Sequence, residues 1–422
     1  MVSENSVQIL LAHRYFWPDS APYGLLLRQI ATLLSQQENF QVTVFTGQPA
    51  YSKAVVAQGP RPRTETIDGG ATVMRARLFS EQRFRSLFRN LNAILFSLQL
   101  AARILVQRPK VVMCSTQPPI FGAALAQFAA GIIRAKFIYH LQDIHPEVAW
   151  VGGQLRKSFV PRLLRWVDAR TCRKADHVVV LSTDMAESIR KRTENPNSPV
   201  HVIQNYNLPD YSERLDVPEG FKKKPGIFRL LFAGNVGHFQ NLDKLVAATS
   251  LVGEEHEFEL VIMGDGKAKP ELQKQVANNN NKRVVFLPYQ PLSIAEPLMS
   301  EADLCVVSLL PDVYRYAFPS KLITYMSQGC PVLVLAESES ELGRFPERYK
   351  IGYSCSQESV DQIARTIEFA IASASDRAEF SERSQQAWQD FFGREQIDAA
   401  WVNLIQSCDT TSANQVSSGA KR

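Results

Sequence analysis

The chain has 422 residues, of which 45% are hydrophobic and 21% are charged, with a formal net charge of +5. This balance excludes disorder outside the chain ends, and the length suits two α/β domains of about 200 residues each. Residues 1–200 hold 25 Lys and Arg against 13 Asp and Glu, whereas residues 201–422 hold 22 against 29. We therefore expect the basic first half to face an anionic surface.

Cysteine spacing excludes a disulfide framework and a structural zinc site, because no C-x-x-C pair occurs among the six cysteines, Cys114, Cys172, Cys305, Cys330, Cys355 and Cys408. Reduced, buried thiols in a cytosolic protein are expected. The N-terminal segment MVSENSVQILLAH enters a strand at once and lacks a basic segment followed by a cleavable apolar stretch, so secretion is not expected.

Strands and helices alternate through the first half of the chain. Apolar runs predict strands at 7–13, 41–47, 111–116, 136–143 and 177–183, and helical patterns occupy 23–37, 118–135 and about 155–174. Strands that are apolar on both faces and separated by helices indicate a parallel, doubly wound sheet. The fold class is therefore α/β, with a Rossmann-like domain over 1–206.

The second half repeats the pattern after a polar, proline-bearing stretch at 207–226, which is expected to be a linker. Strands are predicted at 228–234, 258–266, 283–289, 302–310 and 331–337, with helices from Leu242 and over 269–279. This predicts a second Rossmann-like domain over 227–377. An amphipathic segment at 378–408 is long enough to cross back to the first domain, and 409–422 is expected to be a disordered tail.

Two glycine turns follow strands of the second domain. FAGNVGHFQNL places Gly234 and Gly237 between a strand and a helix, and MGDG places Gly264 at the next strand end. Such glycines allow backbone N–H groups to approach an anion, although a plain turn explains them equally well. The spacing differs from G-x-G-x-x-G, which disfavours NAD.

A helix start in the second domain carries a cation. Pro319 suits a first helical turn, so Ser320 and Lys321 would lie at the positive end of a short helix that stops before Gly329. A lysine beside free backbone donors is a site for a diphosphate, and a solvent-exposed surface lysine is the alternative.

Polar residues cluster after a strand of the first domain, where HLQDIHPEVAW contains His140, Asp143, His145 and Glu147. Ligands of open α/β sheets bind beyond the carboxyl ends of the strands. A metal is not favoured, because no helical i, i+4 histidine pair is present. We expect Asp143 and Glu147 to face the interdomain cleft rather than to form a metal site or a structural ion pair.

These motifs together resemble the retaining glycosyltransferases of family four, which have the two-domain GT-B fold, and in particular the exopolysaccharide and O-antigen enzymes similar to colanic acid glycosyltransferases. The resemblance rests on YFWPDSAPYG, STQPPIFG, LQDIHPEVAW (similar to D-x-W-P-E), FAGNVGHFQNLDKL, GDG, VVFLPYQP and FPSKLITYMSQGCPVLV, and it spans about residues 7–405.

The resemblance implies a UDP- or GDP-linked sugar bound to the second domain, a lipid-linked saccharide acceptor bound to the first, and hexosyl transfer with retained configuration and without metal or cofactor. Catalysis would be chiefly electrostatic stabilisation of the leaving diphosphate, with positioning. Gly234, Gly237, Ser320 and Lys321 would hold the phosphates, with Gly264 beside them. Asp143 and Glu147 would shape the acceptor side, and the backbone to Tyr289 would meet the base.

The sequence departs from the family pattern at two places. The family has two glutamates separated by seven residues, whereas this chain has Tyr316 and Thr324, of which the threonine hydroxyl can still bind a ribose. The usual Arg/Lys pair after the first glycine is replaced by Asn235, His238 and Gln240. These departures leave both uracil and guanine as candidate bases of the donor nucleotide.

Two basic amphipathic stretches in the first domain predict peripheral attachment to an anionic membrane, on the cytoplasmic, inner face of the plasma membrane. Residues 79–110 combine arginines with leucine and phenylalanine but are too punctuated for a bilayer span, and 154–174 form a second such stretch. The alternative to membrane attachment is that the two stretches form an ordinary pair of helices packed on the sheet, with their arginines exposed to solvent. Nucleic acid is not expected, because the arginines lie in apolar helices rather than beside stacking aromatics.

Two other functions remain open from the sequence. A sugar-nucleotide epimerase of similar fold would need neither a membrane nor a separate acceptor. A catalytically silent scaffold of a polysaccharide assembly complex is suggested by Thr324 and the missing cation pair.

Overall fold

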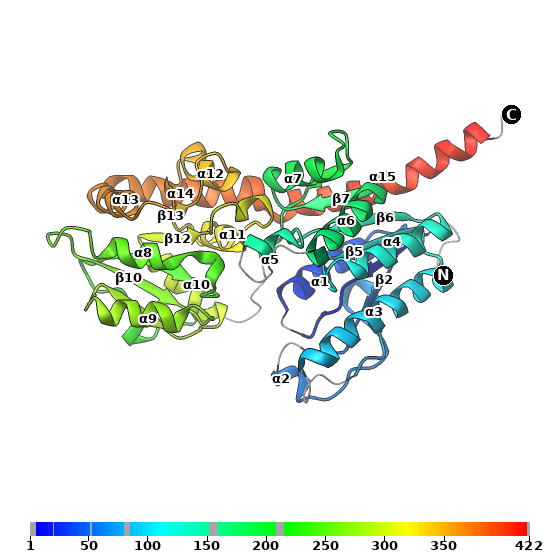
Figure 1. Ribbon diagram of the computed structural model, residues 1–422, viewed down its shortest axis with the longest axis horizontal. Helices are drawn as coiled ribbons and strands as arrows, with labels where there is room; N and C mark the ends of the chain where they lie inside the picture. The colour runs from blue at the N-terminus through cyan, green and yellow to red at the C-terminus, as the bar shows by residue number, and fades with distance from the viewer. Residues whose placement is uncertain are drawn as a thin grey trace. The chain divides into compact units, whose positions relative to one another are not determined.

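The computed structural model describes residues 6–19, 21–50, 53–79, 85–151, 159–207 and 215–419. The chain separates into two compact units, and each is described by itself (Figure 1). Unit 1 comprises Met1–Glu147, Lys157–Tyr206 and Arg394–Arg422, and unit 2 comprises Val148–Arg156 and Asn207–Gly393.

Unit 1 is built on an eight-stranded sheet of order β3-β4-β2-β1-β5-β6-β7-β8, in which only β3 runs antiparallel to its neighbour. Its strands are β1 (Val7–Ala12), β2 (Phe40–Thr46), β3 (Thr64–Thr66), β4 (Thr72–Arg75), β5 (Val111–Ser115), β6 (Lys136–His140), β7 (His177–Val180) and β8 (Val200–Val202). Every residue of β5 is buried, as expected for a strand covered on both faces.

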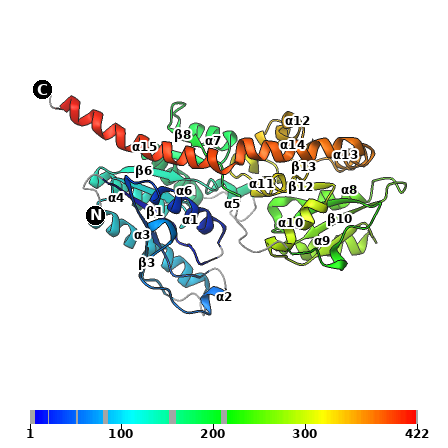
Figure 2. The same ribbon diagram turned by 180° about the vertical axis from the view of Figure 1, so that it is seen from behind.

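Helices cover both faces of this sheet. Right-handed crossovers place α3, α4, α6 and α7 on one face, where neighbouring helices of this series contact one another, and α1 and α15 on the other (Figures 1 and 2). The helices of unit 1 are α1 (Pro22–Ser35), α2 (Lys53–Val56), α3 (Arg85–Gln107), α4 (Phe121–Ile133), α6 (Phe159–Lys174), α7 (Thr183–Thr193) and α15 (Arg394–Gly419); the division between units falls within α5 (Glu147–Val151).

Unit 2 contains a six-stranded parallel sheet of order β11-β10-β9-β12-β13-β14. Its strands are β9 (Phe228–Ala233), β10 (Phe258–Met263), β11 (Val284–Leu287), β12 (Leu304–Ser308), β13 (Val332–Leu335) and β14 (Gly352–Cys355). Its helices are α8 (Leu242–Thr249), α9 (Lys269–Asn278), α10 (Leu292–Glu301), α11 (Ser320–Ser327), α12 (Glu341–Tyr349), α13 (Val360–Ala372) and α14 (Ala374–Phe392).

The core of unit 2 is divided by its sheet into two apolar layers. Side chains of α10, α11, α12 and α14 fill one layer, and those of α8, α9 and α13 fill the other. Both units therefore have the α/β fold of parallel strands covered by helices, and the fold-class prediction is confirmed.

The predicted linker and the predicted C-terminal segments each fall within one of the two units or at their boundary. A linker is expected over 207–226, of which 208–214 lie outside the described residues. The described part, Asn207 and 215–226, groups with unit 2, where Val217 is part of the core. The predicted helical segment at 378–408 lies in α14 and α15, which the unit boundary separates at Gly393. Helix α15 continues to Gly419, through residues for which the sequence favours disorder.

Candidate active site

Two glycine turns meet at the carboxyl edge of the sheet in unit 2. Gly234 follows β9 with φ +119°, and Gly264 follows β10 with φ +134°, a backbone conformation that residues with a Cβ rarely adopt. The amide of Gly234 donates to the carbonyl of Met263 at 2.9 Å, and a Cβ on Gly264 would lie 2.0 Å from the Gly234 oxygen. The two turns are therefore packed so closely that Gly264 has no room for a side chain.

Lys321 lies beside the first of these turns. Helix α11 begins at Ser320 with Pro319 as its N-cap, one position earlier than the proline was expected to sit in the helix. The Lys321 Nζ is 5.0 Å from the centroid of the Phe232 ring, and a Cβ on Gly234 would lie 3.2 Å from that Nζ. The glycine thus leaves the space that the ammonium group occupies.

The Lys321 ammonium group has no hydrogen-bond acceptor and no carboxylate partner in the part of the chain that the structure describes. Burial without such a partner lowers the pKa of Lys321 to about 8. The amides at the start of α11 precede the first intrahelical bond, which Leu322 N donates to Pro319 O at 3.2 Å. An unpaired cation beside free helix-start amides can bind an anion.

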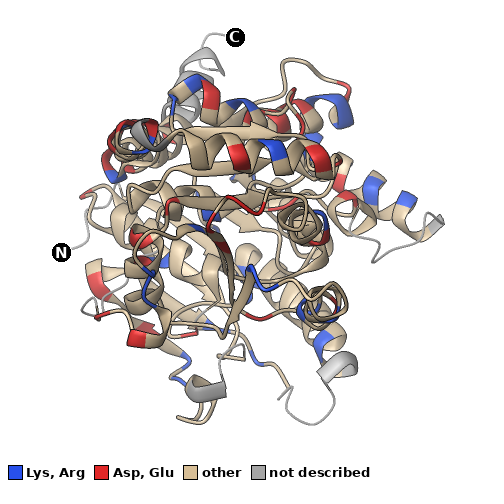
Figure 3. Cartoon of the chain, turned by 90° about the vertical axis from the view of Figure 1, so that its left-hand side faces the viewer, with Lys and Arg blue, Asp and Glu red and all other residues tan. Residues whose placement is uncertain are grey.

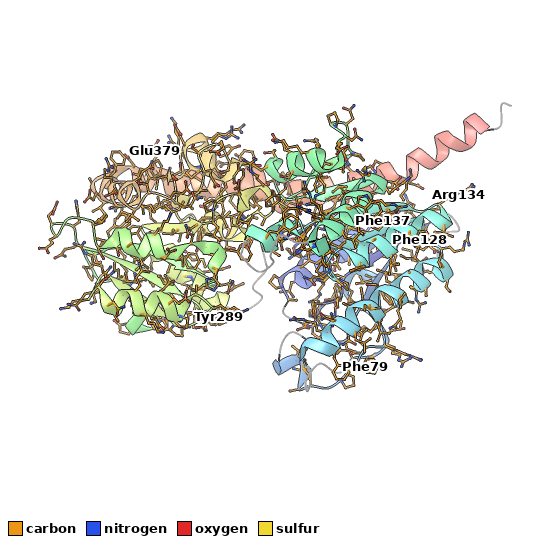
Figure 4. All side chains as sticks on the ribbon, viewed as in Figure 1. Phe79, Phe128, Arg134, Phe137, Tyr289 and Glu379 are labelled. Atoms are coloured by element: carbon orange, nitrogen blue, oxygen red, sulfur yellow. The ribbon has the colours of Figure 1, made fainter. Side chains whose placement is uncertain are left out.

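The other predicted donor residues lie along the same edge of unit 2. Asn235 and His238 are exposed after the first turn, and the Gly237 amide donates to the Gln240 side chain at 3.0 Å. Tyr289 follows β11 with 66% of its surface exposed (Figure 4). The Thr324 hydroxyl lies 3.4 Å from both the Asn207 side-chain oxygen and the Ser320 carbonyl oxygen, so it is already near two acceptors.

Three supporting residues of this edge were not predicted from the sequence. The Ala233 amide donates to the Tyr325 hydroxyl at 2.9 Å, which joins α11 to the end of β9. The Lys269 ammonium donates to the carbonyls of Gly264 at 2.6 Å and Leu287 at 3.2 Å, which joins β10 to β11. In Glu337, after β13, Oε1 accepts from the Asp312 amide, whereas Oε2 is buried without a partner among the described residues.

Asp143 follows β6 at the carboxyl edge of the sheet in unit 1. Its carboxylate has no hydrogen bond or ion pair within the described ranges, and burial raises its pKa to about 6. A half-buried carboxylate that none of the described residues satisfies is available to accept a hydrogen bond from a ligand hydroxyl.

Glu147 has a different environment from the one expected. It is 5% exposed and pairs with Arg192, while its Oε1 lies 3.0 Å from Arg165 Nε. Arg192 also pairs with buried Asp168 and donates to the His145 carbonyl at 3.1 Å. The structural ion pair that the sequence argument set aside is therefore present at Glu147, because Arg192, 45 residues away, reaches it from α7.

Neutral histidines support the loop that carries Asp143. The Tyr23 hydroxyl and His140 Nδ1 are 2.8 Å apart, and the other ring nitrogen of His140 lies 2.8 Å from the Gln142 side chain, which in turn bonds Asn205. Burial lowers the pKa of His140 to about 3, so this ring is uncharged at neutral pH. These contacts fix the start of the loop to α1 and to the segment after β8.

Within the described ranges, no three His, Cys, Asp or Glu side chains gather as a metal site. All six cysteines are free and buried. Among the described residues, every helix is too short or too polar to cross a bilayer.

Two family profiles match the chain: a glycosyl transferase 4-like domain over residues 26–206 and a glycosyl transferases group 1 domain over residues 227–373. The chain is 26% identical to the probable glycosyltransferase WbjE of Pseudomonas aeruginosa, over 67% of this chain and 71% of the relative. It is 23% identical to the putative colanic acid biosynthesis glycosyl transferase WcaI of Escherichia coli K12, over 86% and 92%.

Among solved structures, Anabaena HepE in complex with UDP and glucose matches the chain with a TM-score of 0.64 and 16% identity, covering 95% of this chain and all of that one. At this identity the likeness shows the fold alone. It agrees with the two-domain architecture described above.

Proposed function

We propose that this chain, which belongs to the GT-B glycosyltransferases with a 4-like first domain and a group 1 second domain, transfers a hexosyl group from a nucleotide diphosphate sugar to a lipid-linked saccharide. The reaction breaks the bond between the anomeric carbon and a diphosphate oxygen. An acceptor hydroxyl oxygen bonds to that carbon, and the hydroxyl proton is released. The anomeric configuration is retained.

The unpaired ammonium of Lys321 is the observation that supports this reaction most strongly. Negative charge develops on the diphosphate as its bond to the sugar breaks, so a cation and free amides that are already in place favour the transition state. Lys321, the first turn of α11 and the Gly234 turn are within reach of one anion in unit 2. These groups balance part of the charge of a diphosphate without a metal ion.

On the acceptor side, Asp143 is the group we assign to the hydroxyl that is glycosylated or to its neighbour. Its carboxylate has no partner among the residues of unit 1 that the structure describes, and in its ionised form it accepts stronger hydrogen bonds than a neutral group would. Glu147 is not included, because Arg192 and Arg165 already neutralise it.

The donor base is either uracil or guanine, contacted by the backbone near Tyr289. The complex of Anabaena HepE with UDP and glucose supports a uridine donor as the first candidate. The name of the Escherichia coli relative supports a role in making an exopolysaccharide. The excess of basic residues in residues 1–200 supports work on a lipid-linked acceptor at the inner, cytoplasmic face of the plasma membrane.

A donor panel tests the proposal. UDP- and GDP-sugars are tested first for thermal stabilisation of the full chain, then for transfer to a polyprenyl-diphosphate saccharide, with the product configuration read by NMR. We expect one nucleotide series to stabilise the chain and to give an α-linked product from an α-linked donor. Stabilisation without any product would favour the silent scaffold, and conversion of the donor into its epimer without transfer would favour the epimerase.

A further inference from the structure

Helix α4 of unit 1 buries its small side chains and exposes its large ones. Gly122, Ala123, Ala126, Ala129 and Ala130 face the protein, whereas Phe121, Phe128 and Ile132 are 57%, 60% and 57% exposed. The spacing of seven and four residues places these three side chains on one side of the helix. Phe128 is labelled in Figure 4. An apolar helix in this orientation presents a hydrophobic surface to whatever lies outside unit 1.

The helices on either side of α4 extend this surface. Helices α3 and α6 both contact α4 (Figure 1). A Cβ on Gly122 would lie 3.6 Å from Ser97 Oγ of α3, so small residues allow α3 and α4 to pack closely. More than half of the large apolar side chains exposed in the described ranges lie on these three helices. We call this surface the α4 face, formed by Leu91, Ile94, Leu98, Leu105, Phe121, Phe128, Ile132, Val160, Leu163 and Trp166.

The exposed charges on the three helices of the α4 face have one sign. Helices α3 and α4 contain no carboxylate, and the only one in α6, Asp168, is 1% exposed and paired with Arg192. Arg170 and Arg173 follow Trp166 by four and seven residues and are exposed on the same side of α6. By contrast, Lys and Arg are mixed with Asp and Glu on the side of the chain that faces the viewer in Figure 3, which is the left-hand side of Figure 1.

We propose that the α4 face inserts into the boundary between headgroups and acyl chains of an anionic membrane. An apolar surface this large is unusual on a protein that has no partner, and its three helices expose arginines but no carboxylate, which complements anionic headgroups rather than an ordinary protein surface. The inference rests on the proposed function and adds α4 to the two stretches that the sequence indicates.

The position of α4 relates the membrane to the candidate site within unit 1. Helix α4 begins after the loop that follows β5, and Asp143 follows the neighbouring strand β6. The Phe121 end of the face therefore lies at the same sheet edge as Asp143. An acceptor whose lipid remains in the bilayer would present its saccharide near that carboxylate.

Vesicle co-sedimentation of the full chain tests the insertion. The double variant Phe128→Glu/Ile132→Glu places two charges on the α4 face, and Phe369→Glu on α13 is the matched control, because Phe369 is also 60% exposed. With phosphatidylglycerol/phosphatidylethanolamine vesicles we expect about 10²-fold weaker partitioning for the double variant and wild-type partitioning for the control. Equal melting temperatures would show that all three chains are folded.

Trp166, 58% exposed, reports the depth of insertion. Brominated acyl chains should quench wild-type fluorescence more than that of Trp166→Phe. Unchanged partitioning of the double variant, or wild-type binding that high salt abolishes completely, would overturn insertion in favour of surface adsorption. If the wild-type chain does not bind vesicles but forms a dimer, and the double variant stays monomeric, the α4 face would be an interface with a second copy of the chain instead.

Failure of the membrane insertion can be distinguished from failure of the proposed transferase function. If insertion is correct, the double variant still transfers sugar to a soluble acceptor analogue at the wild-type rate. If the chain has no transferase activity at all, vesicle binding that depends on α4 would still support the insertion.

Discussion

At the scale of single residues, each unit contains one charged group that has no partner among the described residues. The Lys321 ammonium has no acceptor, and the Asp143 carboxylate has no donor. Burying a charge without a partner costs free energy, and such groups concentrate where a ligand supplies the partner. The two predictions that follow use this difference from ordinary ion pairs.

Replacing Lys321 by Ala should lower the turnover number by about 10²-fold, the scale for losing one stabilising group that is in place before the reaction. Steady-state transfer with a verified donor measures the effect. Lys274→Ala on α9 is the control, because Lys274 is an exposed lysine of the same unit and should leave turnover unchanged. Equal rates for both variants would reject the assignment of Lys321.

The pKa of about 6 predicts how Asp143 affects activity and stability. Transfer should increase as the pH rises through about 6, since the ionised carboxylate accepts the ligand hydroxyl. Between the usual carboxyl pKa near 4 and about 6, the folded chain holds a proton that the unfolded chain has lost, so this group's contribution to stability falls as the pH rises. Asp143→Asn should therefore lose transfer yet melt no lower than wild type at pH 7.5. A lower melting temperature would indicate a structural role.

Glu147 should behave in the opposite way. Glu147→Gln removes one partner of the buried Arg192 and should lower the free energy of unfolding by about 3–5 kcal/mol, measured by urea denaturation. Nucleotide affinity of unit 2 should stay at the wild-type value. An unchanged unfolding free energy with loss of transfer would return Glu147 to the acceptor site.

At the scale of elements, the two glycine turns form one unit with the start of α11. Gly264→Ala should weaken nucleotide binding, because its Cβ would displace the Gly234 carbonyl and with it the turn beside Lys321. Calorimetric titration with UDP or GDP measures this loss. Gly131→Ala in α4 is the control, since its Cβ would meet nothing closer than 3.8 Å. Wild-type affinity of the Gly264 variant would contradict the coupling of the two turns.

The elements that sequence patterns predicted correctly are those with continuous apolar runs. Helix α8 begins at Leu242, and β9 and β10 start at the predicted residues, because each strand is covered on both faces. Strands β3, β4, β8 and β14 were not predicted, since they are short and none of them is buried along its whole length. The orientation of α4 could not be predicted either, because alanine and phenylalanine are both apolar and their periodicity does not say which side faces the core.

The same limit applies to the site. The positions of glycine and proline in the sequence were enough to predict the turns and the start of α11. The contacts that hold them, from Tyr325 to Ala233 and from Lys269 to Leu287, join residues far apart in sequence and have no local pattern. The pairing of Glu147 with Arg192 was missed for the same reason.

At the scale of the whole molecule, the two halves of the chain differ in net charge, in agreement with the membrane-facing role that we propose for the first half and the donor-binding role that we propose for the second. Residues 1–200 carry the basic excess, and the helices of the α4 face belong to them. The second half has an acidic excess, yet it contains the unpaired Lys321. A local cation in an acidic unit indicates a specific anion site rather than general attraction of anions.

Proton uptake on nucleotide binding tests the central claim, that Lys321 holds the donor diphosphate, most directly. With a pKa of about 8, Lys321 is roughly half deprotonated at pH 8 in the free chain, and a bound diphosphate should restore the proton. Titration of UDP or GDP into the full chain at pH 8, in two buffers of different ionisation enthalpy, measures that uptake. We expect about half a proton for wild type and none for Lys321→Arg, which stays charged. Equal uptake by both chains, or nucleotide binding by wild type without uptake, would contradict the account.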